Sequence, residues 1–370
     1  MATPRVAVVG AGILGAAIAY QLARRGAEVT VIEAGQPGQQ ASRASFAWIN
    51  GRDKNPREYH DLNRRSLDMW PRFARGLGEV GLVWGGELRW ATSRTGAEAI
   101  ESRVALLHSW GYPIRLMDEE GMGVLEPDLR LGDFQVGSFS EADMQVDPPR
   151  VVERCLERAG DQSATVRTEC EVTGFQTSGS AVTHLDTSDG RVECDVVVLA
   201  AGASAPELAK AAGARAPVYD TFGATVVTTS IKPLFHTVAV VHSPRDHEVP
   251  LNVCQHEDGR VVIHGGRHGD MHDESYGKND DEAQEILQRA CQYFPHLDNA
   301  SVSELRQARR PIPNDGQSII GFSPKATNLY LVATHSGVTL APVISESAAI
   351  EIMDDVEIQA LSPFRPSRFK

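Results

Sequence analysis

The chain has 370 residues, and because a single domain usually takes ~100–200 residues, this length predicts two domains that share an interface. Its 36 basic and 49 acidic residues give a formal net charge of −13, which repels nucleic acid and anionic membrane surfaces. With 42% hydrophobic and 23% charged residues, the composition is that of an ordinary globular protein. We therefore expect a small-molecule partner and no nucleic acid.

Signals for export, membrane insertion and metal binding are missing from the sequence. The first residues lead straight into a short apolar run without the pattern of a signal peptide, so a cytoplasmic location is expected. No apolar run approaches the ~20 residues of a membrane span. The five cysteines include no CxxC pair, and the histidines between residues 246 and 272 match no standard zinc spacing. Reduced thiols and no metal are expected.

The first 33 residues have the pattern of a parallel strand–helix–strand unit. Residues 5–9 are a β-branched run, and residues 13–25 carry apolar side chains at helical spacing. Residues 28–32 predict a second strand. A short glycine-rich turn joins the first strand to the helix, as in the βαβ crossover.

That turn matches the GxGxxG pattern at Gly10, Gly12 and Gly15. The first glycine allows the tight turn, the second lets the backbone approach a pyrophosphate, and the third packs the helix on the strand. Glu33 ends the second strand, where a carboxylate accepts hydrogen bonds from a ribose hydroxyl pair. An acidic residue there argues against a 2′-phosphate and hence against NADP, and leaves NAD and FAD.

Residues 40–50 form a small, hydroxyl-rich segment just after the acidic strand end. Such a segment could wrap a pyrophosphate and a ribityl chain, which would favour FAD, or it could be a plain loop.

Two insertions of another character, 51–145 and 217–316, flank a buried strand predicted within 195–202. The second insertion has a hairpin turn at 257–259. It alternates with a period of two in four runs, which predict an antiparallel sheet: 223–229, 237–241, 251–255 and 260–264.

A last predicted strand, 329–333, is followed by a helical stretch, 338–353. The segment 335–342 therefore starts a helix, and its free N–H groups and positive dipole end suit a reduced flavin, which is anionic at N1 and C2=O. The fold class expected is an α/β FAD-binding Rossmann-like domain, discontinuous in sequence, plus an α+β substrate domain with a mainly antiparallel sheet. The FAD-binding domain takes 1–50, 146–216 and 317–370, and the substrate-binding domain takes 51–145 and 217–316.

The sequence resembles the D-amino-acid oxidase superfamily, in the branch of glycine oxidase, sarcosine oxidase and the D-amino-acid dehydrogenases. The resemblance spans nearly the whole chain, and the order of its blocks is more specific than any one block. These blocks are 6–33, 41–50, 196–202, Arg310-Pro311, Asp315-Gly316, Ile320-Gly321 and 335–342. In such proteins FAD lies extended, with its adenine end at the GxGxxG unit and its isoalloxazine under the antiparallel sheet.

The resemblance implies which residues hold the cofactor. The GxGxxG unit and Glu33 would hold the ADP half, 42–45 would follow the phosphates and ribityl chain, and 336–339 would meet the pyrimidine edge. Arg43 could instead be a plain surface charge. The cofactor-binding residues expected are Gly10, Gly12, Ile13, Leu14, Gly15, Glu33, Ala34, Ser42, Arg43, Ala44, Ser45, Val172, Ala201, Gly202, Arg310, Ser336, Gly337, Val338 and Thr339.

Arg310 matches the arginine that pairs with the substrate carboxylate in relatives such as glycine oxidase. A planar guanidinium can hold a carboxylate in a two-pronged grip. Arg309 offers the same chemistry, but only one of two neighbours on a strand can face the pocket, and we expect Arg310 to do so. A structural ion pair at the domain boundary is the alternative role for Arg310.

Two positions depart from the relatives. His335 stands where glycine oxidase-like proteins can have a second arginine, so the carboxylate grip would be weaker or another polar group would be recognised. His264 aligns near the lysine that activates oxygen in sarcosine oxidases, although a shift would place Arg267 over the ring instead; either could serve if protonated, and His264 could also be an ordinary core or surface histidine. Asn252, Trp48 and Asn50 would complete the substrate pocket.

The resemblance also implies the reaction. We expect FAD-dependent oxidation of the C–N bond of an amino acid or secondary amine, by hydride transfer to flavin N5, to give an imine that water hydrolyses. Oxygen or another acceptor would reoxidise the flavin. The FAD should be non-covalent, because 309–316 contains no cysteine and 34–50 no histidine to tether it. A flavin-dependent 2-hydroxy acid dehydrogenase, an NAD-dependent dehydrogenase and a catalytically silent FAD-binding subunit are the alternatives, and the chain could be a monomer or a homodimer.

Overall fold

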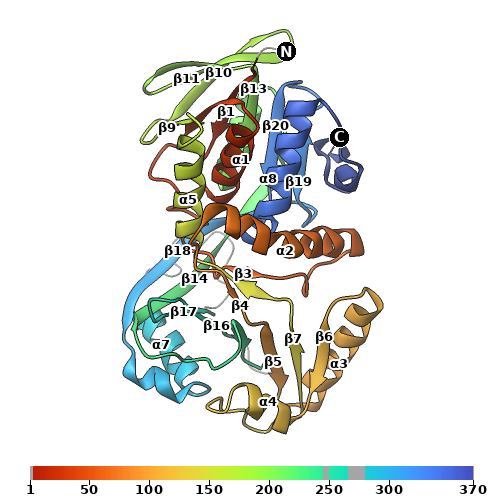
Figure 1. The fold of residues 1–370 in the computed structure, drawn as a ribbon, viewed down its shortest axis with the longest axis vertical. Coiled ribbons are helices and arrows are strands. Elements are labelled where there is room, and N and C mark those ends of the chain that lie inside the picture. Colours follow the sequence, from red (N-terminus) through yellow and green to blue (C-terminus); the bar gives the residue numbers. More distant parts are fainter. Residues whose placement is uncertain (1–2, 245–249, 266–279, 370) are drawn as a thin grey trace.

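A computed structural model of the chain describes residues 3–244, 250–265 and 280–369. Two large sheets lie one above the other in Figure 1, with the long helix α2 (Arg57–Leu77) between them. Arg267, the alternative to His264, falls outside the described residues. No helix in the described ranges is both long and apolar enough to cross a membrane.

The six-stranded sheet is built from three separate stretches of the chain. Its order is β19-β20-β13-β1-β2-β9, and all neighbours are parallel except β19 and β20. The predicted strands 5–9, 28–32 and 329–333 are confirmed with those bounds. In sheet order the strands are Ile319–Phe322, Leu329–Ala333, Val196–Leu199, Arg5–Val9, Glu28–Ile32 and Thr165–Arg167.

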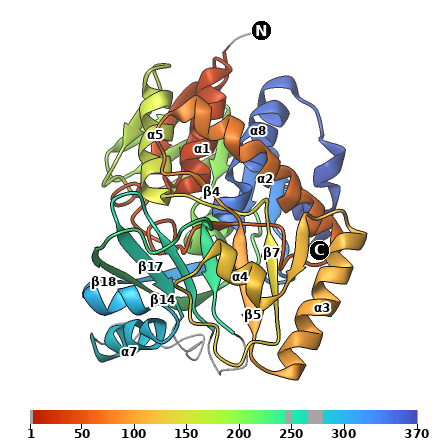
Figure 2. The same ribbon diagram turned by 60° about the horizontal axis from the view of Figure 1, so that its bottom comes forward.

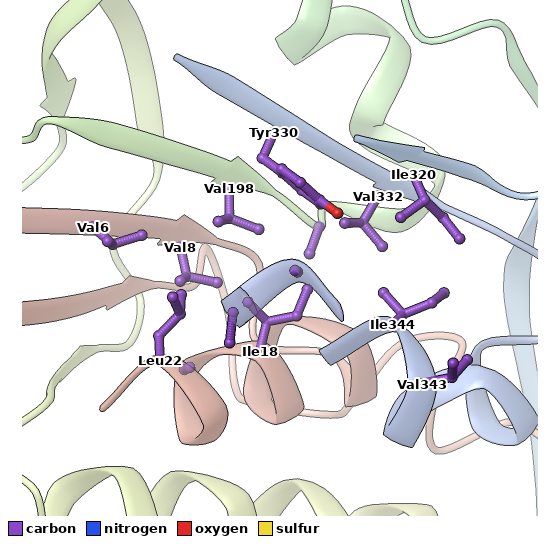
Figure 3. Close-up of a cluster of buried hydrophobic side chains, with 14 of the residues drawn as sticks. Val6, Val8, Ile18, Leu22, Val198, Ile320, Tyr330, Val332, Val343 and Ile344 are labelled. Carbon is purple, nitrogen blue, oxygen red and sulfur yellow. The ribbon is translucent and has the colours of Figure 1, made fainter. Parts of the chain in front are cut away.

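Helices α1 (Ile13–Arg24) and α8 (Gly337–Asp354) pack on one face of this sheet. Figure 3 shows Ile18 of α1 and Ile344 of α8 facing the strands that carry Val8 and Tyr330. Ile18, Val8 and Tyr330 are fully buried, and each buried side chain of this size contributes about 1.5–3 kcal/mol. This core fixes the ends of β1 and β20, from which the two helices begin.

The turn between β1 and α1 needs glycine at two positions. Gly10 has a φ of +97°, and a Cβ atom there would lie 2.6 Å from the carbonyl oxygen of Ala200. A Cβ atom on Gly15 would lie 1.8 Å from the carbonyl oxygen of Gly10. The first turn of α1 therefore packs directly on the backbone at the end of β1, as the glycine pattern predicts.

The eight-stranded sheet has the order β18-β14-β17-β16-β15-β5-β7-β6. Its strands are antiparallel except for β15 and β5, which run parallel. In sheet order they are Val302–Pro313, Val218–Ser230, Arg260–His264, Asn252–Gln255, Val240–His242, Glu87–Ala91, Val136–Ser140 and Ile114–Met117.

The predicted antiparallel sheet and its 257–259 hairpin are confirmed, but the sheet is larger than predicted. Strand β14 is longer than the predicted 223–229, and only the end of 237–241 becomes a strand, β15. Strands β5, β6 and β7 come from the first insertion, so both insertions form one sheet. Their burial is determined by packing on neighbours far along the chain, which period-two alternation alone does not reveal.

The remaining elements surround these sheets. Figure 2 shows α7 beside β14 and β18, with α3 at the opposite edge of the eight-stranded sheet. None of the five cysteines forms a disulfide in the structure, and four are buried. The further helices and strands are α3 (Arg94–Ser109), α4 (Glu119–Leu125), α5 (Pro148–Gly160), α6 (Ala205–Ala211), α7 (Asp280–Cys291), the sheet of β3 (Trp48–Ile49), β8 (Met144–Gln145) and β4 (Val83–Trp84), and the sheet of β10 (Val172–Ser178), β11 (Ala181–Thr187) and β12 (Gly190–Glu193). Short 3₁₀ helices cover 202–204, 295–299, 359–364 and 366–368.

The Gly15 contact can be tested by adding one methyl group. Gly15→Ala must push α1 away from the end of β1, so we expect the free energy of unfolding to fall by about 1–3 kcal/mol, as in overpacked cores. Gly160→Ala is the matched control, because a Cβ atom on Gly160 of α5 meets nothing within 4 Å. Urea unfolding compares the two; equal stabilities would show that the close approach at Gly15 is not needed.

Candidate functional site

One transverse row of the eight-stranded sheet is polar on the face that packs against residues 44–48. Register partners in adjacent strands share a face, so the seven side chains of this row project the same way. We call this set the polar row. Its members, in sheet order, are Arg306, Thr225, His264, Asn252, His242, Arg89 and Ser138.

The Thr225 hydroxyl fixes the orientation of His264. It donates to the carbonyl oxygen of Ala44 at 3.0 Å and lies 3.1 Å from Nδ1 of His264. Because the hydroxyl proton goes to Ala44, Nδ1 of His264 is the donor in the second contact. The predicted catalytic His264 and the predicted cofactor residue Ala44 are therefore joined by one hydroxyl group.

Arg310 projects from β18 onto the same face as His264. A Cβ atom on Gly223 of β14 would lie 3.2 Å from Cε1 of His264 and 3.7 Å from Cδ of Arg310, so glycine lets the two side chains converge from opposite neighbours. Arg309 instead forms an ion pair with Asp220 at 2.5 Å. Burial lowers the pKa of Arg310. Within the part of the chain that the structure describes, no carboxylate forms an ion pair with Arg310.

The N-terminus of α8 carries the last of the predicted residues. Ser336 precedes its first residue, and the first turn, with Val338 and Thr339, contains no acidic residue. Nε2 of His335 donates to the carbonyl oxygen of Gly316 at 3.1 Å. Burial, with a further effect of the charge on Lys54, lowers the pKa of His335 to about 4, so this ring is neutral at pH 7.

Two further predicted residues, Trp48 and Asn50, are tied to α8. The Thr339 hydroxyl donates to the carbonyl oxygen of Trp48 at 3.2 Å and accepts from the backbone N–H of Asn50 at 3.3 Å. The Trp48 ring contacts His242, with 4.3 Å between ring centroids, and thereby also contacts the polar row.

The structure adds Lys54, which sequence reasoning missed. Its Nζ atom donates to the Ser336 hydroxyl at 3.0 Å, so it lies at the N-terminus of α8. Burial, with a smaller effect of the charge on Arg310, lowers the pKa of Lys54 to about 8, against the opposing effects of Asp53 and Asp143. Only the tertiary fold brings these groups together, and a lysine in a polar loop gives no signal for it.

A buried ionic network beside the polar row was also missed. Arg52 donates to Glu87 at 2.6 Å, and both side chains are at most 1% exposed. Arg89 bridges Glu87, at 3.3 Å, and Asp53, at 3.1 Å. Alternating acidic and basic residues on β5 are the one sequence signal for this network, because a charged strand in a buried sheet must find partners.

Asp143 connects this network to Trp48. Its carboxylate accepts hydrogen bonds from the Trp48 indole at 2.7 Å, from Ser140 at 2.5 Å and from the Tyr112 hydroxyl. Burial, followed by the charge on Glu87, raises the pKa of Asp143 to about 7.

The predicted dinucleotide residues gather at the carboxyl ends of β1, β2 and β13. Glu33 accepts from the backbone N–H groups of Ala11 at 2.7 Å and Gly35 at 3.0 Å. The Ser42 hydroxyl accepts from the N–H of Ile13 at 2.9 Å, and the Cys170 N–H reaches the Glu33 carbonyl at 2.9 Å. Ligands of α/β sheets bind at this edge, and the N-terminus of α1, where Gly12 supplies no side-chain cap, suits a pyrophosphate, so the arrangement fits FAD.

The other cofactor candidates take their places around this edge. Arg43 forms an ion pair with Glu304 at 2.5 Å, and its phosphate contact stays a prediction. Val172 begins β10, two residues after the Cys170 that bonds to Glu33. Six further candidates adjoin residues already described in α1, after β2, in the segment 42–50, after β13 and at the start of α8. They are Leu14, Ala34, Ser45, Ala201, Gly202 and Gly337. Among the described residues, no group of three or more His, Cys, Asp or Glu could hold a metal ion.

A family model described as FAD dependent oxidoreductase matches residues 5–349. The chain belongs to this family. The predicted superfamily, the predicted enzyme class of FAD-dependent oxidoreductase and the predicted cofactor FAD are thereby confirmed.

Three relatives of this FAD-dependent oxidoreductase illustrate the likeness. A glycine oxidase from Geobacillus kaustophilus is 24% identical over 98% of this chain and 96% of its own, and its crystal structure has a TM-score of 0.86 with full coverage of both chains. A glycine oxidase from Pseudomonas aeruginosa is 29% identical over 91% of this chain and 92% of its own. The crystal structure of iminodiacetate oxidase from Chelativorans sp. BNC1 has a TM-score of 0.85 at 25% identity, over 98% of this chain and 99% of that one.

The raised pKa of Asp143 predicts a pH dependence of stability in this FAD-dependent oxidoreductase. The folded protein retains a proton on Asp143 that the unfolded chain loses above pH ~4, so the free energy of unfolding falls as pH rises from ~4 to about 7. The contribution is at most about 1.4 kcal/mol per pH unit. Asp143→Asn should flatten this part of the profile, measured by urea unfolding, whereas exposed Asp133→Asn should not. A profile unchanged in Asp143→Asn would show that Asp143 is ionised throughout.

Proposed function

We propose that the enzyme oxidises the C–N bond of an amino acid or secondary amine that carries a carboxylate. The observation that carries this proposal is Arg310, a largely buried guanidinium without an ion-pair partner in the described ranges, on one face with His264. Glycine and iminodiacetate, after which two of the relatives are named, are both amines with carboxylates, which supports the same class.

FAD would lie extended across both sheets, held without a covalent bond. Gly12, in the turn that Gly10 and Gly15 shape, would let the backbone approach the pyrophosphate, and Glu33 would face the adenosine ribose, in a Rossmann-like domain assembled from separate stretches of the chain. The isoalloxazine would then lie between the N-terminus of α8 and the polar row. This placement rests on the glycine cradle at Gly10 and Gly15 and on the uncapped first turn of α8.

Each side chain then has a definite task. Bound FAD would accept hydride at N5 from the substrate carbon and be reoxidised by oxygen or another acceptor, and the imine product would be hydrolysed. Arg310 would hold the carboxylate, and His264 and Asn252 would flank the amine. His335, neutral at pH 7 and with both ring nitrogens in contact with Gly316 and Ser336, would supply an uncharged wall rather than a second cation. Because His335 is neutral where relatives can have an arginine, Arg310 would bind the negative charge of the carboxylate.

Flavin reduction tests the proposed reaction. The FAD-loaded protein should lose its absorption bands near ~450 and ~375 nm when glycine, sarcosine or iminodiacetate is added without oxygen, and should keep them with glycolate or lactate. Acid precipitation should leave the FAD in the supernatant. Bleaching by the hydroxy acids alone would replace the proposal by a 2-hydroxy acid dehydrogenase. If no amine in a panel of differing charge and stereochemistry bleaches the flavin, the chain is a catalytically silent FAD-binding subunit.

Arg310 can be tested against its own neighbour. Arg310→Ala should leave the flavin spectrum intact and reduce kcat/KM by ~10²-fold, because a two-pronged ionic contact worth about 3 kcal/mol is lost in the transition state. Arg310→Lys should restore only part of it, since an ammonium lacks the planar fork. Arg309→Ala is the matched control, and its kcat/KM should stay within about twofold because its partner is Asp220. An equal effect of both Ala variants would refute the carboxylate role.

A further inference from the structure

Lys54 is a second cation near the proposed site, besides Arg310, and its contacts locate its amine. It lies in the loop between β3 and α2, and its amine contacts Ser336, whose hydroxyl is in turn 3.4 Å from Nδ1 of His335. Ser336 is a neutral partner. The adjacent carboxylate, Asp53, is paired with Arg89 at 3.1 Å, so within the described residues Lys54 has no ion pair of its own.

Lys54, Arg310 and His335 share one region. The charge on Arg310 lowers the pKa of Lys54, and both cations lower the pKa of His335, which only neighbouring groups can do. His335 is neutral, so near pH 7 the two remaining groups give this region two positive charges. Asp143 also acts on Lys54, but it accepts three hydrogen bonds from its own neighbours.

Two partly buried cations in one region destabilise a fold unless something neutralises them. This chain has an excess of acidic residues, with a net charge of −13, yet neither cation is paired with a carboxylate in the described ranges. Unpaired buried charges of one sign mark a binding site for the opposite sign. Lys54 and Arg310 together carry two positive charges without an ion pair, whereas the single carboxylate of a simple amino acid supplies one negative charge.

The two cations also come from different elements and have different surroundings. Arg310 extends from β18 of the eight-stranded sheet beside Gly223 and His264. Lys54 extends from the loop after β3 to Ser336 at the N-terminus of α8. A guanidinium fork is suited to hold one carboxylate by itself, and a compact ammonium suits a separate acidic group.

We propose that Lys54 binds a second acidic group of the substrate, so that the preferred substrates are secondary amines with one carboxylate on each side of the nitrogen. This inference rests on the proposed function and names the substrate class of the same site. Arg310 holds the carboxylate next to the carbon that is oxidised, and Lys54 holds the carboxylate on the other nitrogen substituent.

Two unreactive ligands separate the two acidic groups. Thiodiacetate and (methylthio)acetate carry sulfur in place of the amine, and they differ by one carboxylate. Binding to the FAD-loaded protein is measured by calorimetry and by the shift of the flavin spectrum, so turnover is not needed. The wild type should bind thiodiacetate at least ~10-fold more tightly, as expected for one additional charged hydrogen bond.

Lys54→Met should remove this preference. Its affinity for thiodiacetate should fall ~10- to 100-fold and its affinity for (methylthio)acetate should change less than about twofold. Lys54→Arg, which keeps the charge, should retain the preference and shows whether a fold defect explains the loss. Lys210→Met, at an exposed position of α6, should behave as the wild type.

Three outcomes would overturn the proposal. Equal binding of the two ligands by the wild type excludes a second acidic subsite. An equal loss for both ligands in Lys54→Met means that Lys54 shares one carboxylate with Arg310. No loss for either ligand means that Lys54 lies outside the site. A failure of the proposed function is distinguishable, because the ligands would then bind as expected while no amine reduces the flavin.

Discussion

Residues 42–50 hold three parts of the fold in one arrangement, and the site depends on that constraint. Ser42 accepts from the first turn of α1, the Ala44 carbonyl accepts from Thr225 of the sheet, and the Trp48 carbonyl accepts from Thr339 of α8. Each bond ties this segment to an element from a different region of the chain. One short stretch of backbone therefore sets the relative positions of the glycine-rich turn, the polar row and the N-terminus of α8.

The charged residues near this segment differ in whether they form ion pairs. The buried residues Arg52, Arg89 and Glu87 and the partly exposed Asp53 pair with one another, which costs desolvation but leaves no net charge unpaired. Lys54 and Arg310 lie outside that network. The structure thus separates cations that are paired within this network from Lys54 and Arg310, which have no ion pair in the described ranges.

The sequence predicted the parts of this arrangement that local patterns encode. Gly10 is required by its positive φ and Gly15 by its contact with the backbone of Gly10, and β1, β2 and β20 are short apolar runs with clear ends. Strands β5 to β7 escaped prediction because they join the sheet through β5, whose residue Glu87 pairs with Val240 of β15, 153 positions further along the chain. Lys54 escaped for the same reason, since its partner Ser336 is separated from it by 282 positions. The resemblance to relatives pointed to Arg310, but no local pattern distinguishes it from Arg309.

The proposed site depends above all on the isoalloxazine of FAD lying between the N-terminus of α8 and the polar row. A crystal structure of the FAD complex tests this placement most directly. We predict the adenosine ribose at Glu33, the pyrimidine edge of the ring at the first turn of α8, and Arg310 and Lys54 on the substrate side of the ring. A ring placed away from His264 and Arg310, or an Arg310 guanidinium turned out of that space, would contradict it.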